Sequence, residues 1–193
     1  MKTLLVLCLS LVSVALFGQH KGGIEYSENA SFHWGLFKGK INPKHIAEMG
    51  SNTGAVTVSS LSYQTLEMNN RYAKIKITAQ FHPHESWTRY PKLNNADEAL
   101  IHEKRHFDIC EIYARKIRQV VSTTKFSRHS FNDELSFLFK KLAGEHRDLQ
   151  SKYDHETDHS IDAEEQELWN AAIDSKLQEL SEYASTVVTV SLN

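Results

Sequence analysis

One stretch of the chain restricts the fold more than any other, because residues 96–122 contain neither glycine nor proline. Those two residues are the strongest helix breakers, and Asn95 with Glu98 has the spacing of a capping box, so we predict a single long helix here. The chain has 193 residues, which is the length of one ordinary domain. Its other segments have to supply the elements that pack against this helix.

The segments before the long helix have the patterns of β-strands. Residues 55–66 are rich in β-branched side chains, and residues 71–81 alternate polar with apolar side chains, as in a strand with one solvated face. The Asn-Asn pair at residues 69–70 predicts a hairpin turn between them, and the His-Pro pair at residues 82–83 ends the second strand. The aromatic-rich residues 30–37 predict a further strand.

Two helices are predicted after the long one. The first begins near Ser130 and meets Gly144, which we expect to weaken or end it. The second is capped at Asp162 and runs to about Tyr183. The apolar side chains predicted to face inward on these helices are Phe131, Leu135, Leu138, Leu142, Trp169, Ala172, Ile173, Leu177 and Leu180. With a last short strand predicted at residues 185–192, the order of strands first and helices later indicates one α+β domain.

The amino terminus has the pattern of a secretory signal peptide. Met1-Lys2 is a short basic start, and residues 4–17 carry no charge but are too few to span a bilayer as a helix. We predict a signal peptide at residues 1–19 and one domain at residues 20–193, with a retained anchor as the alternative. The mature protein is expected to be secreted or periplasmic, without stable insertion into a membrane.

Composition narrows the classes of function. The chain has 22 basic and 24 acidic residues, a balance that argues against binding to nucleic acid. Beyond the predicted signal peptide the only cysteine is Cys110, which excludes an intramolecular disulfide and is expected in the core. The 11 histidines are an unusually large number and hint at metal or proton chemistry, although most of them, including His146, are predicted to be structural or surface residues.

Residues 102–106, His-Glu-Lys-Arg-His, are an H-E-x-x-H motif inside the predicted long helix. Histidines at positions i and i+4 lie one above the other on a helix, so His102 and His106 can reach one ion. Glu103 can meet a water bound to that ion and act as general base. All three side chains fall on the apolar face of the helix. A cation beside Glu103 explains this placement better than a solvated, salt-bridged segment does, because a buried carboxylate without a partner is costly.

Catalytic zinc takes three protein ligands and keeps one position for water, so a third ligand has to come from elsewhere in the chain. The best candidate is the polar cluster at residues 153–159, which we place between the second and third helices. By chemistry alone either His155 or His159 can serve, and Glu156 and Asp158 are weaker options. Spacing does not decide among them.

Residues 99–113 (ALIHEKRHFDICEIY) and 153–160 (YDHETDHS) resemble a bacterial family catalogued as domain of unknown function 922 and described as secreted zinc-dependent proteases. Residues 34–39 and residues 81–87 (FHPHESW) are similar to two further elements of that family. The resemblance covers residues 31–180 and implies a zincin-like fold, in which an antiparallel sheet precedes the active-site helix and a helical part follows.

The resemblance also implies roles for single residues. Zn²⁺ would be bound by His102, His106 and His159, and Glu103 would be the general base. Tyr153 would orient a ligand or donate a hydrogen bond to the oxyanion.

Further roles are implied around these ligands. Asp154 and Thr157 would support the ligands, and His155 would be a spectator. Residues 72–81 would bind an extended peptide at a sheet edge. The departure from the family pattern is Ser160, where the family tends to have glycine, which adopts a left-handed backbone more easily.

Taken together, these features predict a secreted zinc-dependent peptidase that hydrolyses bonds in a peptide or protein substrate. The first alternative is a non-catalytic exported domain in which zinc replaces the missing disulfides. The second is an exported interaction module without a metal. The sequence predicts neither the cleavage specificity nor the oligomeric state.

Overall fold

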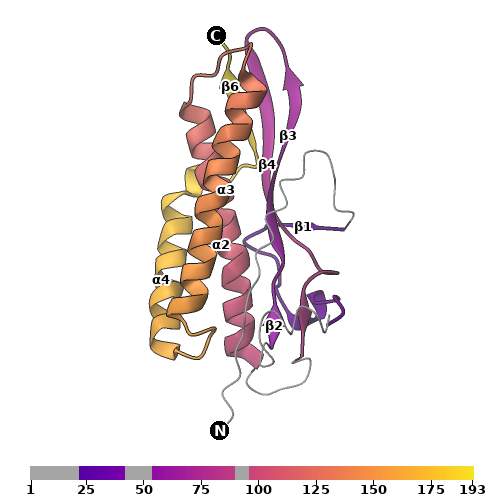
Figure 1. Ribbon diagram of the computed structural model, residues 1–193, viewed down its shortest axis with the longest axis vertical. Helices are drawn as coiled ribbons and strands as arrows, with labels where there is room; N and C mark the ends of the chain where they lie inside the picture. Colours follow the sequence, from indigo (N-terminus) through magenta and orange to yellow (C-terminus); the bar gives the residue numbers. More distant parts are fainter. Residues whose placement is uncertain (1–21, 42–53, 90–95) are drawn as a thin grey trace.

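Antiparallel strands form one layer of the fold, and three α-helices form a second layer on one face of them (Figure 1). The computed structural model describes residues 22–41, 54–89 and 96–193 of the chain. Its architecture confirms the predicted α+β class. The predicted signal peptide at residues 1–19 lies outside the described residues, and within these no helix is both long and apolar enough to span a membrane.

The centre of the sheet is a long hairpin of β3 (Ser59–Met68) and β4 (Tyr72–Phe81). The side-chain oxygen of Asn69 accepts hydrogen bonds from the backbone N–H groups of Arg71 and Tyr72, at 2.8 and 3.1 Å, and so closes the turn. The predicted hairpin, its asparagine turn and the end of its second strand are therefore confirmed.

Strand β4 is paired along both of its edges. Strand β3 covers one edge, whereas β1 (Ile24–Glu25) and β6 (Val187–Ser191) share the other, and the backbones of Tyr26 and Thr186 bond to β4 between them. Strand β6 confirms the predicted last strand. The expectation that residues 72–81 bind an extended peptide at a sheet edge is wrong, because β4 is a central strand.

A short second sheet is formed by the segments on either side of the hairpin in the sequence. Strand β2 (Ala55–Val56) pairs with β5 (Trp87–Thr88), so the strand predicted at residues 55–66 is divided into β2 and β3. The hydroxyl of Thr57 donates a hydrogen bond to the backbone oxygen of Glu103 at 3.1 Å. This bond ties the small sheet to the H-E-x-x-H segment.

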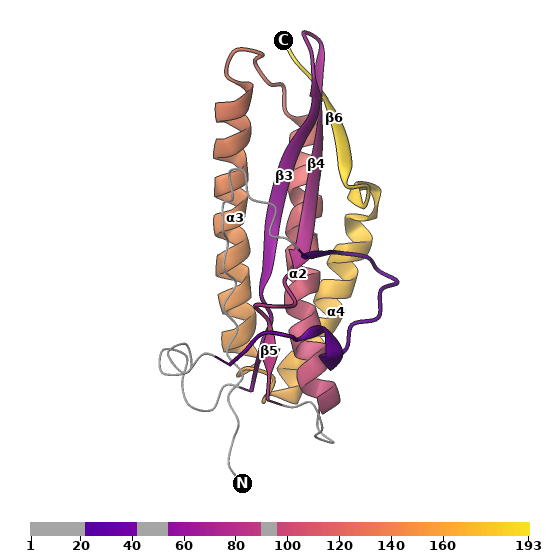
Figure 2. The same cartoon turned by 90° about the vertical axis from the view of Figure 1, so that its right-hand side faces the viewer.

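Helix α2 (Ala96–Thr123) confirms the predicted long helix, while its predicted cap at Asn95 lies outside the described residues. It lies behind the hairpin, with α3 (Phe131–Glu156) on one side and α4 (Ala163–Glu179) on the other (Figure 2). The helix is therefore the central element of the helical layer.

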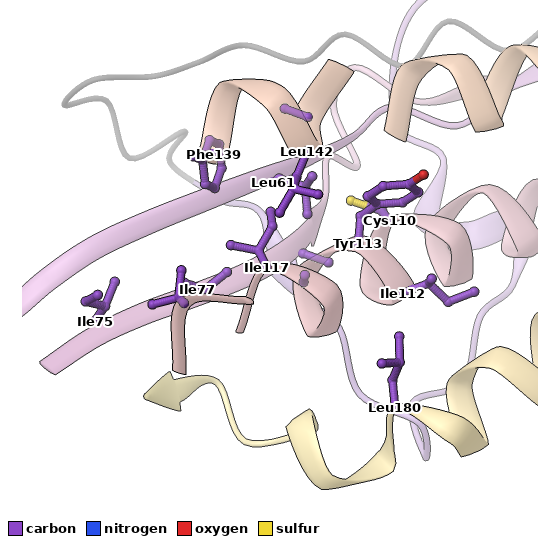
Figure 3. Close-up of a cluster of buried hydrophobic side chains, with 14 of the residues drawn as sticks. Leu61, Ile75, Ile77, Cys110, Ile112, Tyr113, Ile117, Phe139, Leu142 and Leu180 are labelled. Carbon is purple, nitrogen blue, oxygen red and sulfur yellow. The ribbon is translucent and has the colours of Figure 1, made fainter. Parts of the chain in front are cut away.

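The main core lies between α2 and the sheet. Figure 3 shows Leu61 and Ile77 of the sheet beside Ile117 of α2, and all three side chains are buried. Cys110 is also fully buried here, as predicted, and burial raises the pKa of its thiol to about 12.

The face of α2 opposite the motif is buried and ion-paired rather than solvated. Asp108 accepts hydrogen bonds from Lys104 and Arg105, and Glu111 accepts them from Arg115 and Arg118. Arg118 is fully buried and also donates to the backbone oxygen of Ile77 from two of its nitrogens, at 2.9 and 3.0 Å. The middle of this central helix has little solvated surface, so its buried charges are neutralised by ion pairs.

Helix α3 continues through Gly144, so of the two expected effects of this glycine, to weaken or to end the helix, the structure excludes the second. One glycine in a helix costs only about 1 kcal/mol, and the buried face that continues on both sides of it outweighs this cost. The polar cluster at residues 153–159 therefore does not lie wholly between the helices as expected, because residues 153–156 form the last turn of α3.

Helix α4 begins where its cap predicts. The side chain of Asp162 accepts hydrogen bonds from the backbone N–H groups of Glu164 and Glu165, at 3.1 and 3.0 Å. Ile173 and Leu180 face inward as predicted, but Ala172 is exposed. The helix ends at Glu179 and a 3-10 turn, η2 (Ser181–Tyr183), follows.

The strand predicted at residues 30–37 is wrong. The segment contains a 3-10 helix, η1 (Trp34–Leu36), capped by the His33 side chain, which accepts a hydrogen bond from the N–H of Gly35 at 3.1 Å. Its aromatic side chains pack on the core instead of pairing as a strand. The ring centroid of Phe32 lies 5.2 Å from that of Phe81 in β4.

We expect Arg118→Met to lower the free energy of unfolding by roughly 3–5 kcal/mol. The substitution removes one of the two guanidinium partners of Glu111 and both donors to the backbone oxygen of Ile77. Urea unfolding measures the loss. Lys176→Met is the control, since it breaks an exposed pair with Glu179 and is expected to cost less than about 1 kcal/mol. Equal losses in the two variants would contradict the role given to Arg118.

Candidate metal centre

His102 and His106 lie on successive turns of α2, and both side chains are buried. Their Nε2 atoms are 3.2 Å apart, and the two rings meet edge to face with their centroids 4.8 Å apart. The spacing of four residues brings both imidazoles to one point, as the helix geometry predicts.

The third atom at this point belongs to Asp154, in the last turn of α3. Its Oδ1 lies 3.2 Å from Nε2 of His102 and 3.0 Å from Nε2 of His106. Within the described part of the chain, this is the one group of three such side chains close enough together to hold a metal ion. Tetrahedral zinc with bonds of 2.0–2.2 Å separates its ligand atoms by roughly 3.4 Å, which is close to the three distances observed.

Two glutamines contact the histidine rings at Nδ1, the nitrogen that does not face the cluster. Nδ1 of His102 lies 3.0 Å from Oε1 of Gln166, and Nδ1 of His106 is hydrogen-bonded to Oε1 of Gln150. The amide nitrogens of both glutamines are used elsewhere, since Gln150 donates to the backbone oxygen of His106 and Gln166 donates to the hydroxyl of Tyr153. Each amide oxygen therefore faces a protonated Nδ1, and each ring, when neutral, presents the lone pair of its Nε2 to the cluster.

The two glutamines were not predicted from the sequence. Gln150 lies four residues before Asp154, and both are buried on α3, so a polar stripe on a buried helix face was the available signal. Gln166 is in a different helix from both histidines, and nothing in its local sequence points to them.

Tyr153 is fully buried, and its ring contacts the rings of both histidines. Its ring stacks on the His102 imidazole with centroids 4.6 Å apart and an angle of 19° between the planes. Its hydroxyl is hydrogen-bonded to the side chain of Gln166. Of the two roles that the family resemblance implies for Tyr153, this placement favours the orientation of a ligand over donation to an oxyanion.

His159 lies next to Asp154 but outside the group of three. Its Nδ1 is 3.6 Å from Oδ1 of Asp154, and its backbone N–H donates to the backbone oxygen of Asp154 at 2.9 Å. His155, the other histidine considered as a ligand, is exposed on the outside of α3. Asp154, expected only to support the ligands, thus supplies the third atom of the group, and His159 lies beside it.

A left-handed turn places His159. Asp158, His159 and Ser160 have φ values of 43°, 54° and 73°, and none of them is glycine. Such backbone conformations cost of order 1–3 kcal/mol each and persist only where the surroundings impose them. The hydroxyl of Thr157 donates to the backbone oxygen of Tyr153 at 2.8 Å and anchors the start of the turn. The positive φ of Ser160 is a conformation that glycine adopts more easily, in agreement with the glycine that the family resemblance implies at this position.

A model of a bacterial protein family of unknown function, DUF922, matches residues 21–160, which is more than half of the chain. The chain belongs to the DUF922 family. The matched region ends at Ser160, so it contains His102, His106 and Asp154 but not Gln166. Comparisons with curated proteins and with solved structures gave no match.

The ionisable groups of the candidate metal centre in this DUF922 protein shift one another's pKa values. Burial lowers the pKa of His106, but the negative charges of Asp154 and Glu103 and hydrogen bonds with Asp154 and Gln150 outweigh it, so the pKa is raised. Burial raises the pKa of Asp154, but the neighbouring histidines outweigh this effect and hold the pKa well below its usual value. In the metal-free protein a proton on His106 therefore neutralises Asp154.

We expect metal-free protein to lose stability as the pH rises above neutrality. A raised folded-state pKa means that charged His106 stabilises the fold below its unfolded pKa of about 6.5, and that this stabilisation is lost as the pH rises through the folded value. The lowered pKa of Asp154 acts at the other end, where its contribution is lost only as the pH falls well below about 4.

Urea unfolding of metal-free wild type and of His106→Gln, between about pH 6 and pH 9, isolates this effect. The difference between the two proteins should shrink as the pH rises, and the His106 ring should titrate above its ordinary value in an NMR titration. A His106 pKa below the ordinary value would contradict the electrostatic account.

Proposed function

We propose that this protein is a secreted zinc-dependent peptidase. The proposal is based mainly on three acceptor atoms that lie close together. Nε2 of His102 and Nε2 of His106 belong to the H-E-x-x-H helix, and Oδ1 of Asp154 comes from α3. The resemblance of the motif region to secreted zinc-dependent proteases and the signal-peptide pattern of residues 1–19 support it. The substrate would be a peptide or protein outside the cytoplasm.

The chemistry of the donor set fits zinc. With both Nδ1 protons directed at glutamines, two imidazole lone pairs and a carboxylate oxygen face one another within 3.2 Å. Three acceptors at this separation repel unless a cation or a proton lies among them. Histidine nitrogen and carboxylate oxygen are ordinary zinc ligands, and two histidines with one carboxylate form a known catalytic set.

In this proposal His102, His106 and Asp154 hold the metal, and His159 lies beside them. Asp154 takes the third position because its Oδ1 lies within hydrogen-bond distance of both Nε2 atoms, whereas Nδ1 of His159 lies 3.6 Å from that oxygen and outside the group of three. The assignment of His159 as the third ligand, implied by the family resemblance, remains the competing one.

Glu103 is the proposed general base. It follows His102 on α2, its side chain is fully buried, and its charge acts on the His106 imidazole. Its carboxylate would take a proton from the attacking water and pass it to the departing amide nitrogen. When bound, zinc supplies a lowered water pKa, near 7, and polarises the peptide carbonyl.

A second function is favoured by a different observation. His102 and Glu103 have no exposed surface and His106 has 2%. Burial of this degree is expected of a structural metal site, in which zinc would hold together an exported binding domain that has no disulfide. This non-catalytic zinc-stabilised domain is the alternative function.

Glu103→Gln separates the two functions. Purified wild type is expected to contain about one zinc per chain, and the variant should keep its zinc while its peptidase activity falls by at least 100-fold. Metal analysis and cleavage of a mixed peptide library provide the two measurements. Wild type that binds zinc but cleaves nothing would favour the binding domain, and folded wild type that takes up no zinc would refute both functions.

The third ligand is decided by a pair of variants. We expect Asp154→Ala to lose zinc under conditions where His159→Ala retains it, because only Asp154 supplies an atom to the group of three. Zinc affinity measured by competition with a chelator gives the comparison. A His159→Ala protein that loses its zinc while Asp154→Ala keeps it would show that the ligand assignment has to be exchanged.

A further inference from the structure

We propose that His146 is a positioning residue of the metal centre, which orients the amide of Gln150 and thereby holds His106 with its Nε2 available to a metal ion. The consequence for metal binding rests on the proposed function. The effect on His106 itself does not, because it concerns the protonation of a ring in the metal-free chain.

His146, Gln150 and Asp154 are spaced by four residues and form a buried polar stripe along α3. Nε2 of His146 lies 2.9 Å from Nε2 of Gln150. The same amide nitrogen donates to the backbone oxygen of His106, and the amide oxygen is hydrogen-bonded to Nδ1 of His106. A chain of contacts therefore runs from His146 through Gln150 to the proposed ligand.

The chemistry of the contacts allows one arrangement of the protons. The backbone oxygen of His106 can only accept a hydrogen bond, so the nitrogen of the Gln150 amide must face it, at 2.9 Å. The second N–H of that nitrogen then meets Nε2 of His146, which has to accept. His146 is therefore neutral, with its proton on Nδ1.

Other features of its surroundings keep His146 in this form. Its side chain has no exposed surface, and burial, together with the positive charges of His106 and Arg147, lowers its pKa to about 3. Its ring packs edge to face against Tyr113 of α2, with centroids 5.4 Å apart. Among the described residues Nδ1 of His146 has no hydrogen-bond partner, so acceptance from Gln150 is the polar contact that justifies a histidine here.

The acceptor on His146 matters because, together with the backbone oxygen of His106, it opposes a 180° turn of the Gln150 amide. If the amide turned, its nitrogen would face Nδ1 of His106, and that ring would move its proton to Nε2. A protonated Nε2 cannot bind a metal ion. Residues that orient metal ligands in this way typically change metal affinity by 10–100-fold when they are replaced.

The test uses His146→Phe, which keeps a ring of similar size but has no acceptor, and His146→Gln, which restores an acceptor oxygen. Long-range ¹H–¹⁵N spectra of the metal-free proteins at high pH report which nitrogen of each histidine carries the proton. Competition with a chelator reports zinc affinity. His129→Phe, at an exposed position two residues before α3, is the matched control.

In His146→Phe we expect His106 to gain the form with its proton on Nε2, and zinc affinity to fall 10–100-fold. His102, which is oriented by Gln166, should be unchanged, and His146→Gln should restore both properties. An unchanged His106 in a folded His146→Phe protein would overturn the proposal, as would an equal change at His102, which would indicate general loosening.

Wild type alone offers a decisive measurement if His146→Phe does not fold. Its spectrum must show His146 neutral at pH 6, with the proton on Nδ1, and a proton on Nε2 would overturn the proposal. If wild type binds no zinc, the peptidase and zinc-domain functions fail, but the spectrum of the metal-free protein still decides the role of His146.

Discussion

Helix α2 contacts both the sheet and the two other long helices, so every one of its faces has to find buried partners. The apolar face of α2 packs against the sheet through side chains such as Ile117. On the opposite face Glu111 and Arg118 neutralise each other inside the protein. The two histidines and Glu103 lie on a third face of α2, which packs against the end of α3 and the start of α4. Since buried polar groups are costly unless they are hydrogen-bonded, this arrangement requires partners from both helices.

The length of α3 provides most of these partners. Because the helix does not stop at Gly144, it reaches far enough to place Gln150, Tyr153 and Asp154 against α2. The strained turn at residues 158–160 then reverses the chain and starts α4 at once, which brings Gln166 to His102. A strained backbone at this point is consistent with a site where geometry matters more than local stability.

The arrangement also explains why the histidines present Nε2 rather than Nδ1 to the cluster. Glutamine is neutral, so it holds the Nδ1 proton without adding a charge to a region that already contains Asp154 and Glu103. The negative charge at the proposed metal position is therefore limited to two carboxylates, both buried. A divalent cation would balance these charges.

Sequence periodicity was sufficient to predict the elements that depend on interactions between residues close together in the chain. The long helix, the hairpin with its asparagine turn, the Asp162 cap and the convergence of His102 with His106 depend on residues a few positions apart, and each was predictable. The errors arose where distant segments compete with local preference. Residues 30–37 are aromatic because they pack on Phe81, not because they pair as a strand.

Only the tertiary structure decided which residues complete the candidate site. In the structure the atom closest to both Nε2 atoms is Oδ1 of Asp154, in the last turn of α3, and His159 in the following turn lies beside it. The pairing of β4 on both edges depends on β1 and β6, which come from opposite ends of the described chain. Sequence spacing determines which groups share a face of one helix. Which face of another helix lies opposite depends on how the whole core packs, and no local pattern contains that information.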